Sequence, residues 1–135
     1  MSADANSIFR AYLAANAGII AIVGAKIYCP RVPENTALPA LGFFARGGDS
    51  NPYIPQIVSP SYQFDCWGTS AIQARSLYVA LYDCLQGLQN ATITIGATTY
   101  RILSAVEEAQ GQDIQDVDEI GYHRVIAFFD VMIEI

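Results

Sequence analysis

The sequence predicts an α+β protein with two short N-terminal helices, a mainly antiparallel sheet of about five strands, and one long helix over about 70–87 on one face of the sheet. Apolar residues recur at helical spacing near the N-terminus and again after residue 70, and apolar and polar residues alternate in later segments. The 135 residues are the length of one ordinary domain, residues 1–135. The hydrophobic fraction of 53% is above the roughly 45–50% of average domains, so some apolar surface is expected to meet a partner.

Two helices are expected at the N-terminus. Ser7 is a suitable N-cap for a first helix from about Ile8 to Ala15, and Asn16 can cap a second short helix that ends at Gly24. The apolar positions at helical spacing are Ile8, Phe9, Tyr12, Leu13, Ile19, Ile20 and Val23.

The segment Ala11–Ala25 is uncharged, but it is shorter than the roughly 20 residues of a spanning helix. A secretory signal is a second interpretation, because Ile19–Val23 could be an apolar h-region before a small-residue cleavage site. Arg10 is the only cation before it and Asp4 opposes that charge. We therefore interpret the segment as core helix.

Proline-rich sequence follows. After a short extended Lys26–Tyr28, Pro30, Pro33 and Pro39 exclude helix and predict an irregular crossing to a strand at about Leu41–Ala45. Glycines and prolines in residues 46–60 then predict a long loop, and such loops are usually functional or disordered. This loop is the first candidate protein interface, with candidate residues Arg46, Asp49, Asn51, Tyr53 and Ile54.

The second half of the chain predicts most of the sheet and the main helix. Alternation over Tyr62–Trp67 predicts a strand with one buried face, and Ser70 with Gln73 three residues later resembles a capping box. Gly96-Ala97 between two β-branched runs fits a type II′ hairpin. The stripe of the main helix is Ala74, Leu77, Tyr78, Leu81, Cys84, Leu85 and Leu88.

The last strand, residues 122–135, is apolar on both sides between Ile126 and Met132. Solvated faces of antiparallel sheets normally turn polar, and one helix cannot cover both faces. We therefore expect the second face to pack on the N-terminal helices or on another subunit.

The net charge of −6 lies in one segment. The chain has 13 acidic and 7 basic residues, and six of the acids fall within residues 107–119, which contain no Lys or Arg. We expect this segment to be an exposed loop and a second candidate interface. No basic patch is present that could release counterions from DNA or RNA, so specific nucleic-acid binding is not expected. The candidate residues are Glu107, Glu108, Asp113, Asp116, Asp118 and Glu119.

Catalytic, metal and cofactor motifs are not found in the sequence. His123 is the only histidine and no G-x-S-x-G elbow accompanies it, so we assign it no role. Asp65 and Asp130 could form an acid–base pair, but we expect Asp65 on the polar side of its strand and Asp130 paired with Arg124 or Arg101. The acidic run lacks the spacing of an EF-hand, and no phosphate-binding glycine motif occurs. No catalytic residue, metal or cofactor is therefore predicted.

The three cysteines, at positions 29, 66 and 84, are odd in number and have no C-x-x-C pairing. A disulfide framework or zinc site is not indicated. We expect all three to be buried, reduced thiols made in a cytosol.

Taken in order, these features resemble the small tail-completion family of long-tailed phages, whose members act as tail terminators or head–tail joining proteins. The resemblance covers most of the chain and depends on the order of packing patterns. The long 46–60 and acidic 107–119 segments match no family motif. The segments that carry it are the opening helices with Gly24–Tyr28, the crossing to Leu38–Leu41, Tyr62–Trp67 before the Ser70 helix, and the closing Tyr122–Met132 strand.

The resemblance implies a non-catalytic virion protein in the tail or neck region, assembled in the host cytoplasm. It implies a homohexameric ring that caps the finished tail tube, stops its growth and presents a surface to the head connector. The expected partners are then other copies of the chain, the tail tube protein and the head connector or stopper, with DNA only as passing cargo and no membrane. Two alternatives stay open: a head-side neck protein, and a small α+β enzyme or ligand-binding domain with a closed apolar pocket.

Overall fold

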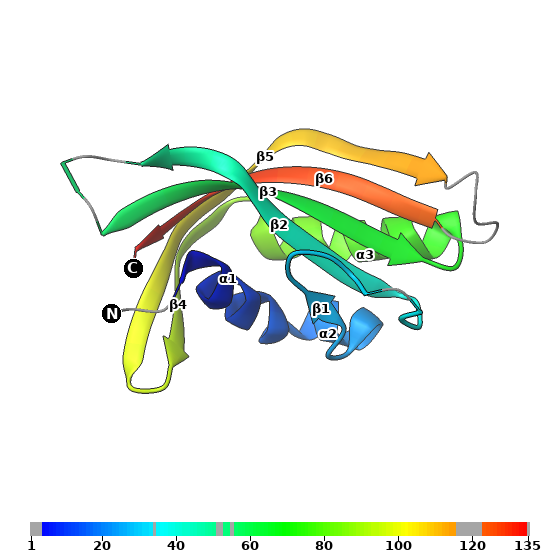
Figure 1. The fold of residues 1–135 in the computed structure, drawn as a ribbon, viewed down its shortest axis with the longest axis horizontal. Coiled ribbons are helices and arrows are strands. Elements are labelled where there is room, and N and C mark those ends of the chain that lie inside the picture. The colour runs from blue at the N-terminus through cyan, green and yellow to red at the C-terminus, as the bar shows by residue number, and fades with distance from the viewer. Residues whose placement is uncertain (1–3, 34, 51–52, 55, 116–122, 135) are drawn as a thin grey trace.

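The protein is described from a computed structural model that covers residues 4–33, 35–50, 53–54, 56–115 and 123–134. A curved six-stranded sheet arches over the helices, which all lie on its concave side (Figure 1). The strand order is β1-β2-β3-β6-β5-β4, with β1 parallel to β2 and the other neighbours antiparallel. The elements are α1 (Ala5–Ala14), α2 (Ala17–Val23), β1 (Ile27–Tyr28), β2 (Ala40–Ser50), β3 (Ile57–Gly68), α3 (Ala71–Leu85), β4 (Leu88–Ile95), β5 (Thr98–Gln115) and β6 (His123–Glu134).

The α+β class is confirmed, with differences in detail. The sheet has six strands instead of about five, because the two-residue β1 adds an edge and the other strands are longer than expected. The first helix begins at Ala5, three residues before the expected start, because the side chain of Asp4 accepts a hydrogen bond from the Asn6 amide at 3.0 Å. The expected cap at Ser7 is therefore wrong.

The other helix caps follow the sequence. The side chain of Asn16 accepts from the Ile19 amide at 3.1 Å, and Gly24 ends α2 with a φ of 62°. Ser70 accepts from the Gln73 amide at 3.1 Å, and the Gln73 carboxamide oxygen accepts from the Thr69 amide at 2.7 Å. This is the expected capping box, shifted by one residue on the return bond. No single described helix is long and apolar enough to cross a membrane, although α1 and α2, bent by 82°, pass that test together by length and composition.

Stacked aromatic rings fix α1 onto the sheet. The Phe9 ring lies 4.8 Å from that of Tyr62 and almost parallel to it, and the rings of Phe43 and Phe64 pack around this pair. The Tyr62 hydroxyl donates to the Asn6 side chain at 2.9 Å, which satisfies the polar end of a fully buried side chain. The apolar stripe of α3 covers β3, β6 and β5 beside it.

All three helices therefore share one face of the sheet. Of the two coverings expected for the second face, the N-terminal helices are wrong, and packing on another subunit stays a prediction. Because Phe9 packs on Tyr62, α1 lies on the side of β3 that α3 also covers. The opposite face is left without a helix among the described residues (Figure 1).

The expected long loop at residues 46–60 is mostly a β-hairpin. β2 continues to Ser50 and β3 starts at Ile57, and a bulge between Ala45 and Gly48 accommodates the glycines within the ladder. Pro60, which has no amide hydrogen to donate, lies opposite Gly48.

The expected acidic loop is also wrong for residues 107–115. β5 runs through them to Gln115 and pairs with β6 over this length. The turn between β4 and β5 is the predicted one, with Gly96 at a φ of 62°. Two cysteines, Cys66 and Cys84, are buried as expected, but Cys29 is exposed because it follows β1 at the edge of the sheet.

Candidate functional site

The face of the sheet opposite the helices, called here the open face, is the candidate protein interface. Cross-strand partners share a face, and the register places Phe44 beside Gln63 and Gln63 beside Phe128. Several of these side chains are only half-buried, and Met132 is 38% exposed. The residues of the open face used below are Phe44, Gln63, Asp65, Trp67, Arg124, Ile126, Phe128 and Met132.

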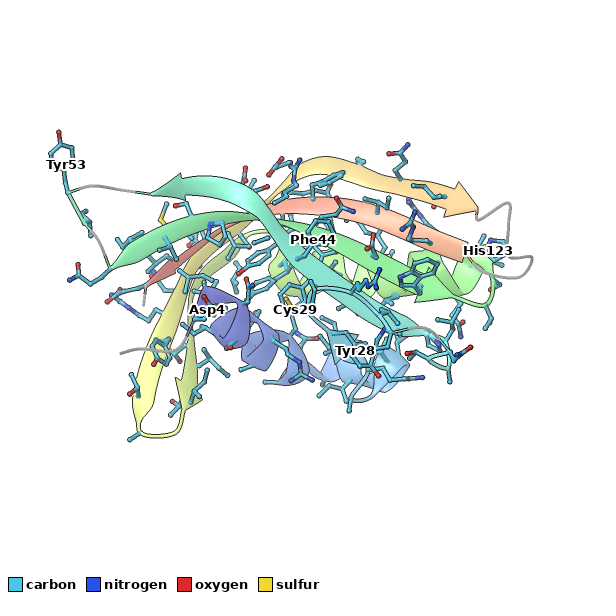
Figure 2. The ribbon with its side chains drawn as sticks, viewed as in Figure 1. Asp4, Tyr28, Cys29, Phe44, Tyr53 and His123 are labelled. Carbon is cyan, nitrogen blue, oxygen red and sulfur yellow. The ribbon has the colours of Figure 1, made fainter. Side chains whose placement is uncertain are left out.

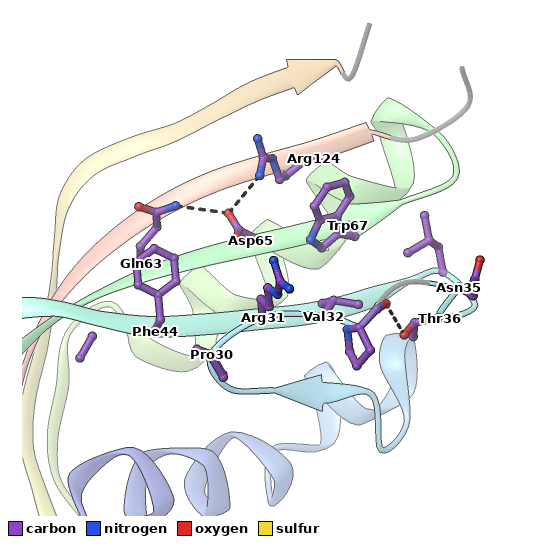
Figure 3. A pocket seen from close by; sticks show the side chains of 13 residues that line it. Pro30, Arg31, Val32, Asn35, Thr36, Phe44, Gln63, Asp65, Trp67 and Arg124 are labelled. Carbon is purple, nitrogen blue, oxygen red and sulfur yellow. Dashed lines mark hydrogen bonds and ion pairs between the residues drawn. The ribbon is translucent and has the colours of Figure 1, made fainter. Parts of the chain in front are cut away.

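A groove of about 900 Å³ lies on this face, between the crossing at residues 30–38 and the strands β2, β3 and β6 (Figure 3). The crossing lies against β2 because Gly42 has no side chain. A Cβ added to Gly42 would meet Val32 Cγ2 at 3.1 Å and its amide nitrogen at 3.2 Å. Trp67 of β3 and Arg124 of β6 are among the residues that line the groove.

Asp65 is the buried acid of this groove, and its residue is only 8% exposed. Arg124 Nη1 lies 4.0 Å from Asp65 Oδ1, and the Gln63 carboxamide donates to the same oxygen at 3.5 Å. Burial raises the pKa of the Asp65 carboxyl, and the charge of Arg124 opposes the rise. The Arg124 guanidinium also lies 5.0 Å from the centre of the Trp67 ring.

A second polar cluster lies farther along the open face, around Glu108. This carboxylate pairs with Arg46 and accepts from the Ser61 hydroxyl. Hydrogen bonding from Asp130, then from Ser61 and Arg46, lowers the pKa of Glu108. The Arg46 guanidinium also covers the Phe128 ring at 4.2 Å.

The expected partners of Asp130 are therefore wrong. Arg124 is used by Asp65, and Arg101 pairs with Glu134 across the sheet. Asp65 and Asp130 have different partners, so the structure does not assemble them as an acid–base pair.

Glu107 and Asp113 lie on the helix side of β5 and contact α3. The Tyr78 hydroxyl donates to Glu107 and accepts from the Gly111 amide at 3.0 Å. Arg75 donates to the Gly111 carbonyl at 3.0 Å and to Asp113 at 3.3 Å. Side chains of α3 thus satisfy backbone groups of β5 beyond Ala105, where β4 no longer pairs with it.

The hairpin candidates lie at one end of the molecule. Tyr53 is 91% exposed and Ile54 is 45% exposed, beyond the end of β2. Figure 2 shows Tyr53 projecting at the end opposite His123. Asp49 lies in β2, but its side chain is not among the described ones. Four further candidates lie outside the described residues: Asn51, Asp116, Asp118 and Glu119.

His123 begins β6 and is paired with Gly68 and Gln115 in the ladder. Among the residues that the structure describes, no group of three or more His, Cys, Asp or Glu is placed to hold a metal ion.

Sequence reasoning missed the groove and the arginine–aromatic pairs. The alternation over 62–67 puts Gln63, Asp65 and Trp67 on one side of the strand, and this signal could have found half of the groove. The other half depends on where the proline-rich crossing lies, which no local pattern indicates.

The sequence matches no known protein family and no curated protein. A comparison of structures does find a match: one chain in the solved virion of a native gene transfer agent (GTA) particle superposes with a TM-score of 0.63. The two chains share one fold. The match covers 98% of this chain and 99% of the other, at 18% sequence identity.

Proposed function

We propose that this chain is a non-catalytic structural protein of a phage-like virion, which forms a ring at the head-proximal end of the tail. In this role it ends growth of the tail tube and joins the tail to the head connector. The observation that carries the proposal is the fold shared with a chain of a gene transfer agent virion over nearly the full length of both chains. The order of the helices, the proline-rich crossing and the strands also supports the tail-completion role, because that order resembles the tail-completion family.

The open face supports assembly with other copies. An antiparallel sheet that faced water permanently would be polar there, whereas this face carries Phe44, Trp67, Ile126 and Phe128. Arg46 and Arg124 lie over two of these rings, so a single copy remains partly protected from water. A specific interface between copies should bury more than roughly 1,000 Å² in total.

The charges fit a protein that DNA passes without specific binding. The chain has a net charge of −6, and four of its seven basic residues form ion pairs with its own acids. The proposed partners are therefore other copies, the tail tube protein and the head connector. The chain would assemble in the host cytoplasm and remain in the tail or neck of the virion.

The deciding experiment deletes the gene that encodes the chain and images the particles that are then produced. Overlong tails without heads support a tail terminator, whereas heads that leak DNA beside tails of normal length indicate a head-side neck protein. Labelled protein imaged on intact particles should show a ring at the tail end. Normal particles in the absence of the chain, or a single isolated copy on them, would overturn the proposal.

The groove of about 900 Å³ is the one observation that favours ligand binding instead. Native mass spectrometry of the purified protein distinguishes the two. A small molecule that co-purifies at one per chain supports the ligand-binding function, and its absence supports the structural one.

A further inference from the structure

Parts of the sheet have a free edge. Apart from the two-residue β1, three stretches lack a neighbouring strand on one side among the described residues: β2 beyond Gly42, β5 beyond Ala105, and the outer side of β4. A free edge presents unpaired amide and carbonyl groups to which a strand of another chain can bind. Natural proteins therefore protect their edges with charges, prolines, bulges or covering side chains.

Two of the three stretches have such protection. The free part of β2 is interrupted by a bulge and contains Arg46 and Asp49. On β5, side chains of α3 bond to the backbone of Gly111, and the Gln86 side chain accepts a hydrogen bond from the Glu107 amide at 2.7 Å. Neither stretch is an open template for another strand.

The β4 strand has no protection of this kind. The sequence between Asp83 and Arg101 contains no charged residue and no proline. Among the described residues, only β5 bonds to the backbone of residues 91–95, and the β4–β5 hairpin projects at the edge of the molecule (Figure 1). The outer side of β4 is thus the edge that fits a further strand.

The hairpin register shows which backbone groups of β4 point outward. In a two-residue hairpin, the residues that flank the turn, here Ile95 and Thr98, exchange both ladder bonds, and bonded pairs then alternate along the strands. Ile95 and Ile93 therefore bond to β5. The amide and carbonyl groups of Thr92 and Thr94 point away from β5, toward the free side.

We propose that β4 pairs antiparallel with β4 of a second copy around a two-fold axis at Ile93, and that the free chain forms this dimer. In this register Thr92 lies opposite the partner's Thr94, so the outward backbone groups of both residues are paired. On the face that packs against the core, Ile93 meets the partner's Ile93 and Ala91 meets the partner's Ile95. Apolar residues thus face apolar ones and threonine faces threonine, which are favourable cross-strand pairs.

Charge and the state of the other edges favour a second copy as the occupant. In a chain of net charge −6, the uncharged residues 84–100 are where two copies approach without repulsion between like charges. Because the other free stretches are protected, β4 is the edge that a second copy offers. The contact lies outside the open face, so the inference does not depend on the proposed ring. One pair of strands makes a small interface, and the dimer should therefore be weak and concentration-dependent.

Sedimentation equilibrium of the purified chain over a range of concentrations tests the association. We expect monomer and dimer without larger species, because a two-fold contact occupies both edges. Thr92→Pro removes an outward amide and no ladder bond to β5, so it should raise the dissociation constant by about tenfold or more. Thr92→Val keeps the amide and is the matched control, which should dimerise like the unchanged chain. Circular dichroism checks that both variants are folded.

Disulfide formation tests the register without a proline. With the exposed Cys29 replaced by serine, Ile93→Cys should give a linked dimer on oxidation, because facing residues of a non-bonded pair have Cα atoms about 4.5 Å apart. Thr92→Cys is the control, since residue 92 of the two copies would be separated by more than the roughly 7 Å that a disulfide spans. A chain that stays monomeric at the highest soluble concentration overturns the inference. So does a dimer that a folded Thr92→Pro protein retains in full, or one in which Ile93→Cys cross-links no better than Thr92→Cys.

Discussion

The Arg46 guanidinium carbon lies 4.2 Å from the centre of the Phe128 ring, and the same side chain, which belongs to β2, pairs with Glu108 of β5. One arginine thus shields an aromatic ring of the open face and holds a carboxylate from the acidic segment. An exposed ion pair alone contributes little to stability, so the effect of Glu108 should be visible mainly through pH.

The first prediction concerns the acid stability of Glu108→Gln. Hydrogen bonds from Asp130 and Ser61, together with Arg46, lower the pKa of Glu108 below its ordinary value of 4.5. A lowered folded pKa means that the stabilisation is present above pH 4.5 and is lost as the pH falls through the lower, folded value. Melting temperatures of the two proteins should therefore differ at neutral pH and converge in acid. Gln112→Ala is the neutral control on the same strand, and parallel pH profiles for Glu108→Gln and the wild type would contradict the prediction.

The second prediction concerns Asp65, whose pKa shifts in the opposite direction. Burial raises the folded pKa above 3.8, so the stability of the wild type falls as the pH rises through the folded value. Asp65→Asn removes this loss, and its stability relative to the wild type should increase from acid to neutral pH. Urea unfolding at several pH values measures the difference.

Arg124→Ala tests whether the charge of Arg124 opposes the rise in the pKa of the Asp65 carboxyl. Without the guanidinium, the Asp65 carboxylate keeps its burial and loses its partner, which should cost about 1–2 kcal/mol at neutral pH. The cost should shrink in acid and in the Asp65→Asn background, as a double-mutant cycle would show. Equal costs in both backgrounds would mean that Arg124 acts through Trp67 alone.

Local signals in the sequence predicted the helices well. Asn16 and Ser70 could be predicted as caps because an N-cap needs only a hydrogen bond from the amide three residues later to its side chain. Alternation over 62–67 likewise predicted which side of β3 is buried, since that depends on neighbouring residues only. Ser7 failed because Asp4, an equally good cap, lies one turn earlier.

Features that depend on distant pairing could not be predicted in this way. Gly47, Gly48 and Pro60 have the composition of a loop. In the folded chain they lie within the β2–β3 hairpin, because a bulge interrupts the ladder between Ala45 and Gly48 and accommodates them. Glu107 and Glu108 have the sequence surroundings of a solvated loop, but folding brings Tyr78 beside Glu107 and Arg46 beside Glu108. The groove depends on the approach of the crossing to Gly42, which only the folded chain reveals.

The third prediction concerns the side of α3 that faces the sheet. Leu81 is fully buried, so Leu81→Asp should unfold the protein by burying an unpaired carboxylate, and Leu81→Ala should cost about 2–5 kcal/mol. Gln73→Ala removes a cap acceptor for the Thr69 amide and should cost only about 0.5–1 kcal/mol. Chemical denaturation compares them. A Leu81→Asp protein of wild-type stability would mean that α3 presents another side to the sheet.

The last prediction concerns Gly111, where β5 passes under Tyr78. A Cβ on residue 111 would lie 2.7 Å from two carbon atoms of the Tyr78 ring. The ring cannot shift easily, because its hydroxyl bonds to Glu107 and to the Gly111 amide and because Arg75 lies 4.9 Å from its centre. Gly111→Ala should therefore destabilise the protein by about 1–3 kcal/mol through overpacking.

A second substitution shows whether the clash is the cause. In a Tyr78→Ala background the space above residue 111 is empty, so Gly111→Ala should cost almost nothing there. Urea unfolding of the four proteins gives the coupling, and Gln110→Ala controls for a general effect on β5. The coupling matters because, within the part of the chain that the structure describes, β5 beyond Ala105 has no strand on its outer side, and Tyr78 and Arg75 bond to the backbone of Gly111 instead. If Gly111→Ala costs the same in both backgrounds, the helix does not hold this edge of the sheet.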